Sequence, residues 1–282
     1  METSKSLPPI TKITKYTLID EVRQKSFLIM FVICAICVFL IRGCYHGNYM
    51  VNGHDLDTGT VVRALSKVTF HIIAAGMMVI AALLSMRIFR RDRSEGMQAC
   101  VFSKPIARWQ YVMGKILGLW VLSVLFMFIL HSIVFLITSI NLKVFMPEYL
   151  VASLLCSVNL LFVVIAVLFL SLLMPDIVAF LCVFGIGIVG FVGDGIAAAS
   201  HSQMAQVMMQ QSGARTQSDL TWWKTVYYLW PKLLGVQQLA SSLIDSESFH
   251  GFGSIYPLIN VLLYSIILGA LLFKRFRNED IV

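Results

Sequence analysis

The 282-residue sequence contains little charge. Charged residues make up 13% of it and hydrophobic residues 58%, whereas a soluble domain has about 25% charged residues. The apolar residues lie mainly in long uninterrupted runs, which a soluble core does not need. The composition therefore excludes a soluble globular protein and predicts an integral membrane protein.

The sequence also lacks the motifs of nucleotide-binding and hydrolytic enzymes. It has no G-x-x-x-x-G-K-[ST] run, because Gly114 and Lys115 are followed by Ile116, so a P-loop cannot cradle ATP phosphates here. The H-E-x-x-H and G-x-S-x-G motifs are missing too. We therefore expect no enzyme activity, no catalytic residue and no bound cofactor in this chain, and ATP-driven work requires another protein.

A disulfide framework is not indicated either. Four of the six cysteines lie inside apolar runs, where cysteine behaves as a small hydrophobic residue. Cys34 and Cys37 spell C-x-x-C, but they lie in the middle of a lipid-length segment without other ligands. We predict neither a redox site nor a metal site from this pair.

Six segments are long and apolar enough to suggest transmembrane helices, since a bilayer core of roughly 30 Å requires about 20 apolar residues. The first is the weakest because it is short, and Pro175 and Asp176 leave room only for a tight hairpin between the fourth and fifth. The predicted fold is an all-α integral membrane protein. Its predicted spans are 27–41, 68–86, 116–140, 149–174, 177–198 and 255–273.

The distribution of Lys and Arg predicts the orientation. If the N-terminus is inside, the inner segments hold 15 of the 22 Lys and Arg residues, as the positive-inside rule requires. We expect a multi-pass protein of the cytoplasmic (inner) membrane with both termini in the cytoplasm. No cleavable signal peptide is evident, and the first apolar run is expected to remain as an anchor. Because the basic residues flank apolar runs, the pI near 9.2 reflects this orientation, and we predict no nucleic-acid partner.

Two segments outside the spans have a helical pattern. Residues 8–25 place apolar side chains at three-to-five-residue spacing with lysines between them, which favours an amphipathic helix in the membrane interface over an unstructured polar tail. The long outer segment 199–254 contains Trp222, Trp223 and several other aromatic residues. Because Trp and Tyr prefer the headgroup level, residues 220–244 are predicted to form a broken helical segment at the outer interface.

The loop 87–115 is the most informative segment. It is longer than a connection between neighbouring helices needs and begins with a basic cluster. Pro105 is suited to the first turn of a short helix, to which Ile106, Trp109 and Tyr111 would give an apolar side. We therefore predict a short helix here, parallel to the membrane and attached to two spans, on which a soluble motor can push.

The residues of this loop resemble those of a known family. Glu95-Gly96 is followed by a "KPI-x-R-x-x-Y-x-x-GK" run from Lys104 to Lys115, which is similar to the permeases of the ABC-2 superfamily. The closest branch contains copper-enzyme maturation and gliding-type permeases. The resemblance covers the whole topology and implies one transmembrane domain over residues 1–282.

This resemblance implies a half-transporter that pairs with a second permease subunit, identical or similar, and with separate ATP-binding-cassette ATPase subunits. It implies transport across the membrane, most simply export. The loop between spans two and three would supply the coupling helix. By analogy, the ATPase contact is assigned to Arg90, Arg91, Arg93, Glu95, Gly96, Lys104, Pro105, Arg108 and Trp109.

Other interpretations remain open. The arginines could serve only the positive-inside rule and binding to anionic membrane lipids, although that does not account for Glu95-Gly96 or the loop length. A non-transporting scaffold or assembly factor could anchor a soluble partner through the same loop. An ion-coupled secondary carrier is a third class, but such carriers usually show repeated halves and several mid-membrane charges. The substrate cannot be read from the sequence.

Several polar residues and glycines lie within the spans. We expect His71, His131 and Asn159 to hydrogen-bond across helix interfaces, and the glycines of the fifth span to permit close packing. Asp194 is expected to be a solvated helix end. His201, Met204, Met208 and Met209 could present Cu(I) ligands on one helical face, but methionine is abundant throughout, so no metal site is predicted and a metal role stays open.

Overall fold

The computed structural model describes residues 8–41, 50–51, 54–55, 58–103, 106–142, 146–201, 229–244 and 251–278. It confirms the predicted all-α class. The described residues also include one pair of antiparallel strands, each of two residues. The elements are α1 (Pro9–Arg23), α2 (Lys25–Ile41), β1 (Met50–Val51), β2 (His54–Asp55), α3 (Thr58–Met86), α4 (Ile88–Ser94), α5 (Met97–Phe102), α6 (Arg108–Leu142), α7 (Glu148–Ser171), α8 (Asp176–His201), α11 (Leu233–Ile244) and α12 (Gly251–Arg277).

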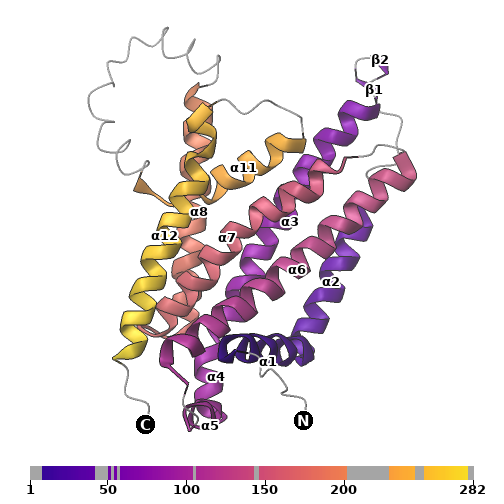
Figure 1. Ribbon diagram of the computed structural model, residues 1–282. Coiled ribbons are helices and arrows are strands. Elements are labelled where there is room, and N and C mark those ends of the chain that lie inside the picture. The colour runs from indigo at the N-terminus through magenta and orange to yellow at the C-terminus, as the bar shows by residue number, and fades with distance from the viewer. Residues whose placement is uncertain are drawn as a thin grey trace, which may run out of the picture.

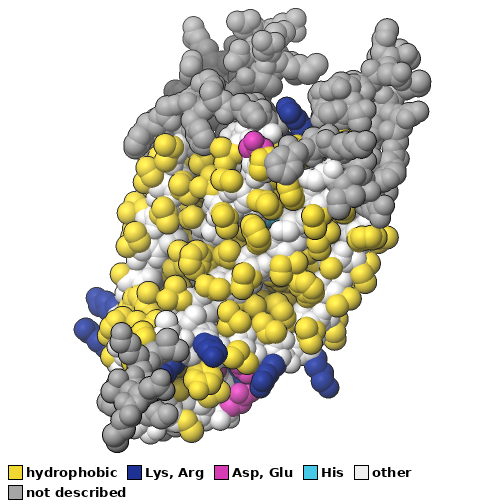
Figure 2. Space-filling view, turned by 45° about the vertical axis from the view of Figure 1, so that its right-hand side comes forward, with side chains coloured by type: hydrophobic (Ala, Val, Ile, Leu, Met, Phe, Trp, Pro, Cys, Tyr) yellow, Lys and Arg dark blue, Asp and Glu magenta, His cyan; other side chains and the backbone are white. Residues whose placement is uncertain are grey.

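Five helices among the described residues are long and apolar enough to cross a membrane, namely α3, α6, α7, α8 and α12. A sixth crossing is obtained if α1 and α2, which are bent by 67° relative to each other, are counted as one span. The short first span of the prediction corresponds to α2, which has 17 residues. Figure 2 shows hydrophobic side chains covering the middle of one face, with Lys and Arg at its lower edge, as expected for a membrane-spanning bundle.

α7 is the central helix of the bundle (Figure 1). It packs against α3, α6, α11 and α12 and also contacts α8. Its buried residues lie on all sides, and several of them, such as Ala152, Ser153 and Cys156, are small. Small side chains let neighbouring backbones approach closely, which is how helices associate where lipid is as apolar as the protein. α2 lies on the opposite side of α6 from this core.

α1 is the predicted amphipathic helix, and it packs along the first part of α6. Ile13, Thr17 and Glu21 are buried at four-residue spacing, which places them on one helical face. The contact is close because α6 has glycines there. A Cβ atom at Gly114 would lie 2.6 Å from Cγ2 of Ile13, and one at Gly118 would lie 2.8 Å from Cβ of Thr17.

α11 corresponds to part of the predicted broken segment 220–244. It packs against α3, α7, α8 and α12. Seven of its twelve residues are buried, whereas Gln238 is exposed. Gly235 permits the approach of α12, since a Cβ there would lie 2.9 Å from Cβ of Pro257. Residues 221–228, with most of the predicted aromatic anchors, lie outside the described residues.

Candidate functional site

The loop that follows α3 forms two short helices, α4 and α5, at the end of the bundle where α1 lies (Figure 1). Gly96 joins them with a φ of 68°, a left-handed conformation that glycine adopts at no steric cost. The residue pair Glu95-Gly96, noticed in the sequence, is therefore the turn between these two helices.

The prediction of a separate short helix after Pro105 is wrong. Arg108 begins α6, which continues without interruption to Leu142. Tyr111 and Val112 are fully buried rather than on a surface face. The reason is tertiary: α1, α4, α5 and α12 all contact the first turns of α6, so this segment is already part of the bundle.

A buried ion pair connects α4 to α6. The Nζ atom of Lys115 lies 2.6 Å from Oδ2 of Asp92, and both side chains are buried. The hydroxyl of Tyr111 donates a hydrogen bond to the same carboxylate oxygen. Charge-assisted bonds of this kind are about twice as strong as neutral ones, so α4 is held firmly to α6.

A second set of ionic contacts connects α4 to α1. Nη2 of Arg91 lies 2.7 Å from Oε1 of the buried Glu21 and also contacts Asp20. Burial raises the pKa of Glu21, and the positive charge of the Arg91 guanidinium acts in the opposite direction. Arg91 therefore faces α1, inside the molecule.

Two further contacts connect this region to α8 and α12. Nη1 of Arg90 lies 3.5 Å from Oδ2 of Asp176 at the start of α8. Nη1 of Arg108 donates a 2.9 Å hydrogen bond to the backbone carbonyl of Arg277 near the end of α12, where the helix dipole favours a cation. The α4–α5 segment and the start of α6 are thus connected to α1, α8 and α12 by polar contacts.

The predicted site residues fall into two groups. Arg90, Arg93, Glu95, Gly96 and Trp109 are exposed, whereas Arg91 faces inward and Arg108 is partly covered. Lys104 and Pro105 lie outside the described residues. Sequence reasoning missed the contributions of the following residues: Asp20, Glu21, Asp92 and Lys115. Two signals were present in the sequence: Asp92 is the single acidic residue within the basic run, and Lys115 ends the motif that begins at Lys104.

Comparison with known families gives a match over nearly the whole chain. The model of the family described as "ABC-2 family transporter protein" matches residues 12–281. The chain belongs to the ABC-2 family. It is thus a multi-pass permease of an ABC transporter, and membership implies partnership with an ABC ATPase subunit. No curated protein sequence matches the chain significantly.

This ABC-2 permease also has a surface hollow at the start of α6. A hollow of about 510 Å³ separates the start of α6 from the end of α12 and is lined by Arg108, Trp109, Val112, Phe273, Lys274, Phe276 and Arg277. Trp109 is 53% exposed there. Arg108 and Trp109, the two predicted residues at the start of α6, therefore lie at a separate, partly hollow surface and not at the turn between α4 and α5.

The predicted interhelical hydrogen bonds of the permease are confirmed. Nδ1 of His71 lies 3.3 Å from Oε1 of Gln237 in α11, and Nδ1 of His131 lies 2.8 Å from Oγ of Ser153 in α7. The side-chain amide of Asn159 donates a 2.8 Å bond to the carbonyl of Leu233. These polar groups join neighbouring helices of the bundle.

Two expectations for the fifth span need correction. Asp194 is not a solvated helix end, because it is buried and its Oδ1 lies 3.2 Å from Nζ of Lys232. Among the glycines, Gly190 does pack closely, near Trp230. A Cβ atom at Gly185 or Gly187, however, would meet nothing within 4 Å. The packing partner of a glycine cannot be identified without the tertiary structure.

The described residues contain no group of three or more His, Cys, Asp or Glu side chains that could hold a metal ion. Met204, Met208 and Met209 lie outside the described residues, and only the backbone of His201 is described. The possible metal role of these four residues therefore stays open.

Proposed function

We propose that this permease transports its substrate by coupling to ATP hydrolysis in a separate ATPase subunit, which docks on the α4–α5 tip, defined as Arg93–Met97. One observation carries the proposal: the tip is exposed, while the residue next to it, Asp92, is fixed by a buried ion pair to α6. A docking surface that is attached to α6 by a buried ion pair can transmit a movement to the bundle.

The ionic contacts next to the tip suggest how the movement is transmitted. A displacement of the tip acts on α6 through Asp92 and Lys115, and on α1 through Arg91 and Glu21. Ionic contacts are stronger in a low-dielectric interior than in water. The helices would therefore move with the tip instead of letting α4 slide past them. We propose that this tilting opens the transport path.

The charge distribution supports a cytoplasmic position for this end. Arginines and lysines of α4, α6 and the last turn of α12 gather here, as the positive-inside rule favours. With this orientation both termini are cytoplasmic, and the ATPase meets the tip directly. We further propose that two permease subunits pair in the inner membrane and that transport is outward.

The proposal is tested by reversing the charges of the tip. The double variant Arg93→Glu, Glu95→Arg should weaken binding of the ATPase by about tenfold or more, because interface charges would meet like charges. The measurement is co-purification of the ATPase in mild detergent, with its ATP hydrolysis rate. A matched control is Lys274→Glu, Arg275→Glu, which reverses two exposed charges at the end of α12.

The control should bind the ATPase normally. If the tip variant retains full binding and full transport, the docking assignment is wrong. If the wild-type chain binds an ATPase but moves no substrate, the protein is a scaffold and not a transporter.

A further inference from the structure

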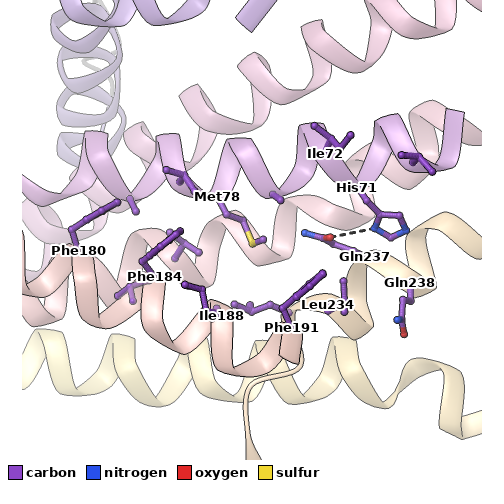
Figure 3. A pocket seen from close by; sticks show the side chains of 18 residues that line it. His71, Ile72, Met78, Phe180, Phe184, Ile188, Phe191, Leu234, Gln237 and Gln238 are labelled. Atoms are coloured by element: carbon purple, nitrogen blue, oxygen red, sulfur yellow. Dashed lines mark hydrogen bonds between the residues drawn. The ribbon is translucent and has the colours of Figure 1, made fainter. Parts of the chain in front are cut away.

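Two hollows of the bundle differ in charge. The larger, of about 660 Å³, lies between α3, α8 and α11 (Figure 3), and its polar residues His71 and Gln237 are hydrogen-bonded to each other. Among the described residues that line it, none is Asp, Glu, Lys or Arg. The hollow of about 510 Å³ at the start of α6, here called the α6–α12 hollow, is bordered by the cations Arg108, Lys274 and Arg277. Since no Asp or Glu stands among its described lining residues, its charge favours an anion.

The two walls of the α6–α12 hollow are bonded to each other. Nη1 of Arg108, the first residue of α6, donates a 2.9 Å hydrogen bond to the carbonyl of Arg277 in α12. Lys274 and Arg277 are three residues apart, which places them on the same side of α12. Val112 and Phe276, which also line the hollow, are buried. The hollow therefore combines cations on two connected helices with an apolar interior.

The helix dipoles at this hollow offset each other. α6 begins here and α12 ends here, so the positive end of one dipole lies beside the negative end of the other. The side-chain cations, and not a helix end, therefore set the sign of the field that a ligand meets.

The hollow lies at the depth of lipid headgroups. α1 crosses the direction of the spans at this end of the bundle (Figure 1), as an interfacial helix does, and contacts α6 at Gly114 and Gly118. At 1.5 Å per residue, Val112 and Arg108 lie about 3 Å and 9 Å beyond Gly114. The headgroup layer on each side of a bilayer core is roughly 5–8 Å thick. Trp109 is 53% exposed here, and tryptophan prefers this layer.

An apolar track leads away from the hollow along α12. Leu262, Ile266 and Gly269 precede the lining residue Phe273 at three- and four-residue spacing, so the four residues share one side of the helix. Leu262 and Ile266 are exposed, and a Cβ atom at Gly269 would meet nothing within 4 Å. A hydrocarbon chain attached to an anion in the hollow can lie on this track. A soluble anion or an acidic peptide would leave it uncovered.

We propose that the α6–α12 hollow binds the phosphate of an anionic glycerophospholipid, which stays bound to the bundle as a resident lipid. The phosphate lies between Arg108 on one wall and Lys274 and Arg277 on the other. The glycerol backbone packs on Trp109, and one acyl chain follows the track along α12. The lipid thereby joins the start of α6 to the end of α12, and this site does not rest on the proposed transport function.

The experiment measures the binding of phosphatidylglycerol, with a fluorescent label at the end of one acyl chain, to the full chain in mild detergent. The double variant Lys274→Gln, Arg277→Gln should weaken this binding about twentyfold, because each basic residue beside an anionic lipid contributes a factor of about five. Trp109→Ala should weaken it by a smaller factor, since it removes packing and no charge.

The matched control is the double variant Arg23→Gln, Arg275→Gln. It also removes two exposed cations from this end of the bundle, but neither residue lines the hollow. The control should bind phosphatidylglycerol like the wild type. Equal weakening in the two double variants would show a general attraction to positive charge and would overturn the site.

Phosphatidylcholine with the same label and acyl chains tests the headgroup. It should bind the wild type at least about tenfold more weakly than phosphatidylglycerol, because its choline cation meets the cations of the hollow. Equal affinity for the two lipids would overturn the anionic headgroup.

Inorganic phosphate and the end of the chain itself are the competing occupants. Inorganic phosphate at the concentration of the lipid should not displace the label, and displacement would identify a site for soluble anions. Glu279 and Asp280 follow Arg277 closely in the sequence. Deletion of residues 279–282 should leave the affinity for phosphatidylglycerol unchanged. A gain as large as the loss in Lys274→Gln, Arg277→Gln would show that these acidic residues occupy the hollow, and the proposal would be wrong.

The binding assay contains no ATPase, so its outcome is separate from the docking test at the tip. If phosphatidylglycerol binds at the hollow and no ATPase binds at Arg93–Met97, the proposed function fails and the lipid site remains. If the ATPase binds and the hollow double variant retains full lipid affinity, the lipid site fails and the proposed function remains.

Discussion

α7 and α8 are neighbouring helices of span length, and both consist almost entirely of apolar residues. In the structure, 67% of the residues in the most apolar part of α7 are buried, against 17% in α8. α7 contacts α3, α4, α6, α8, α11 and α12, whereas large side chains of α8 such as Ile177, Leu181 and Phe191 face outward.

The difference shows how little hydropathy says about position within a membrane protein. Lipid tails and protein cores are equally apolar, so an apolar side chain gains about the same by facing either. What distinguishes α7 is its set of inward contacts, such as the bond from Asn159 to the carbonyl of Leu233. Stability should therefore reside in residues that face other helices, and the outward face of α8 should be left for lipid, substrate or a partner.

The largest expected effect is the loss of stability when a buried ion pair is broken. Asp92→Ala leaves Lys115 buried without its partner, and this should lower the free energy of unfolding by about 3–5 kcal/mol. Asp176→Ala, which removes the more exposed pair of α8 with Arg90, should cost less than about 1 kcal/mol. Chemical unfolding in mild detergent measures both. The double variant Asp92→Ala, Lys115→Met should recover most of the lost stability. If Asp92→Ala and Asp176→Ala lower the free energy of unfolding equally, the buried pair is no more important than the exposed one and the prediction is wrong.

Apolar truncations compare the two helices directly. Leu168 of α7 is fully buried, whereas Leu181 of α8 is 55% exposed. Leu168→Ala should destabilise the protein by about 2–5 kcal/mol, because it leaves a cavity. Leu181→Ala should change stability by less than about 1 kcal/mol, since detergent or lipid fills the space. Chemical unfolding in mild detergent measures both variants. If Leu181→Ala lowers the free energy of unfolding as much as Leu168→Ala does, another protein surface covers α8.

Glycine substitutions give the smallest expected effect. Gly114→Ala places a methyl group within 2.7 Å of Cβ of Ile13, so α1 must shift, at a cost of about 1–3 kcal/mol. Gly185→Ala in α8 meets open space and should be neutral or stabilising by up to about 1 kcal/mol, because alanine favours helix. Unfolding measurements on both variants test this. A stabilising Gly114→Ala would show that α1 does not pack tightly on α6.

Features that depend on neighbouring residues in the sequence were predicted well. The long apolar runs predicted the all-α class, and the stripe through Ile13 and Thr17 predicted α1. The loop after α3 was identified as a distinct segment, but its internal structure was not. Its two short helices turn at Gly96, while the helix expected after Pro105 is the beginning of α6.

The sequence by itself determined that this chain forms membrane-length helices, because twenty apolar residues must satisfy their backbone hydrogen bonds internally in lipid. Only the tertiary structure decided which helix is central, that α11 packs against four other helices and that Asp92 pairs with Lys115 and Asp194 with Lys232. Those features depend on residues far apart in the chain. A buried charge is stable only where its partner is placed beside it by the packing of several helices.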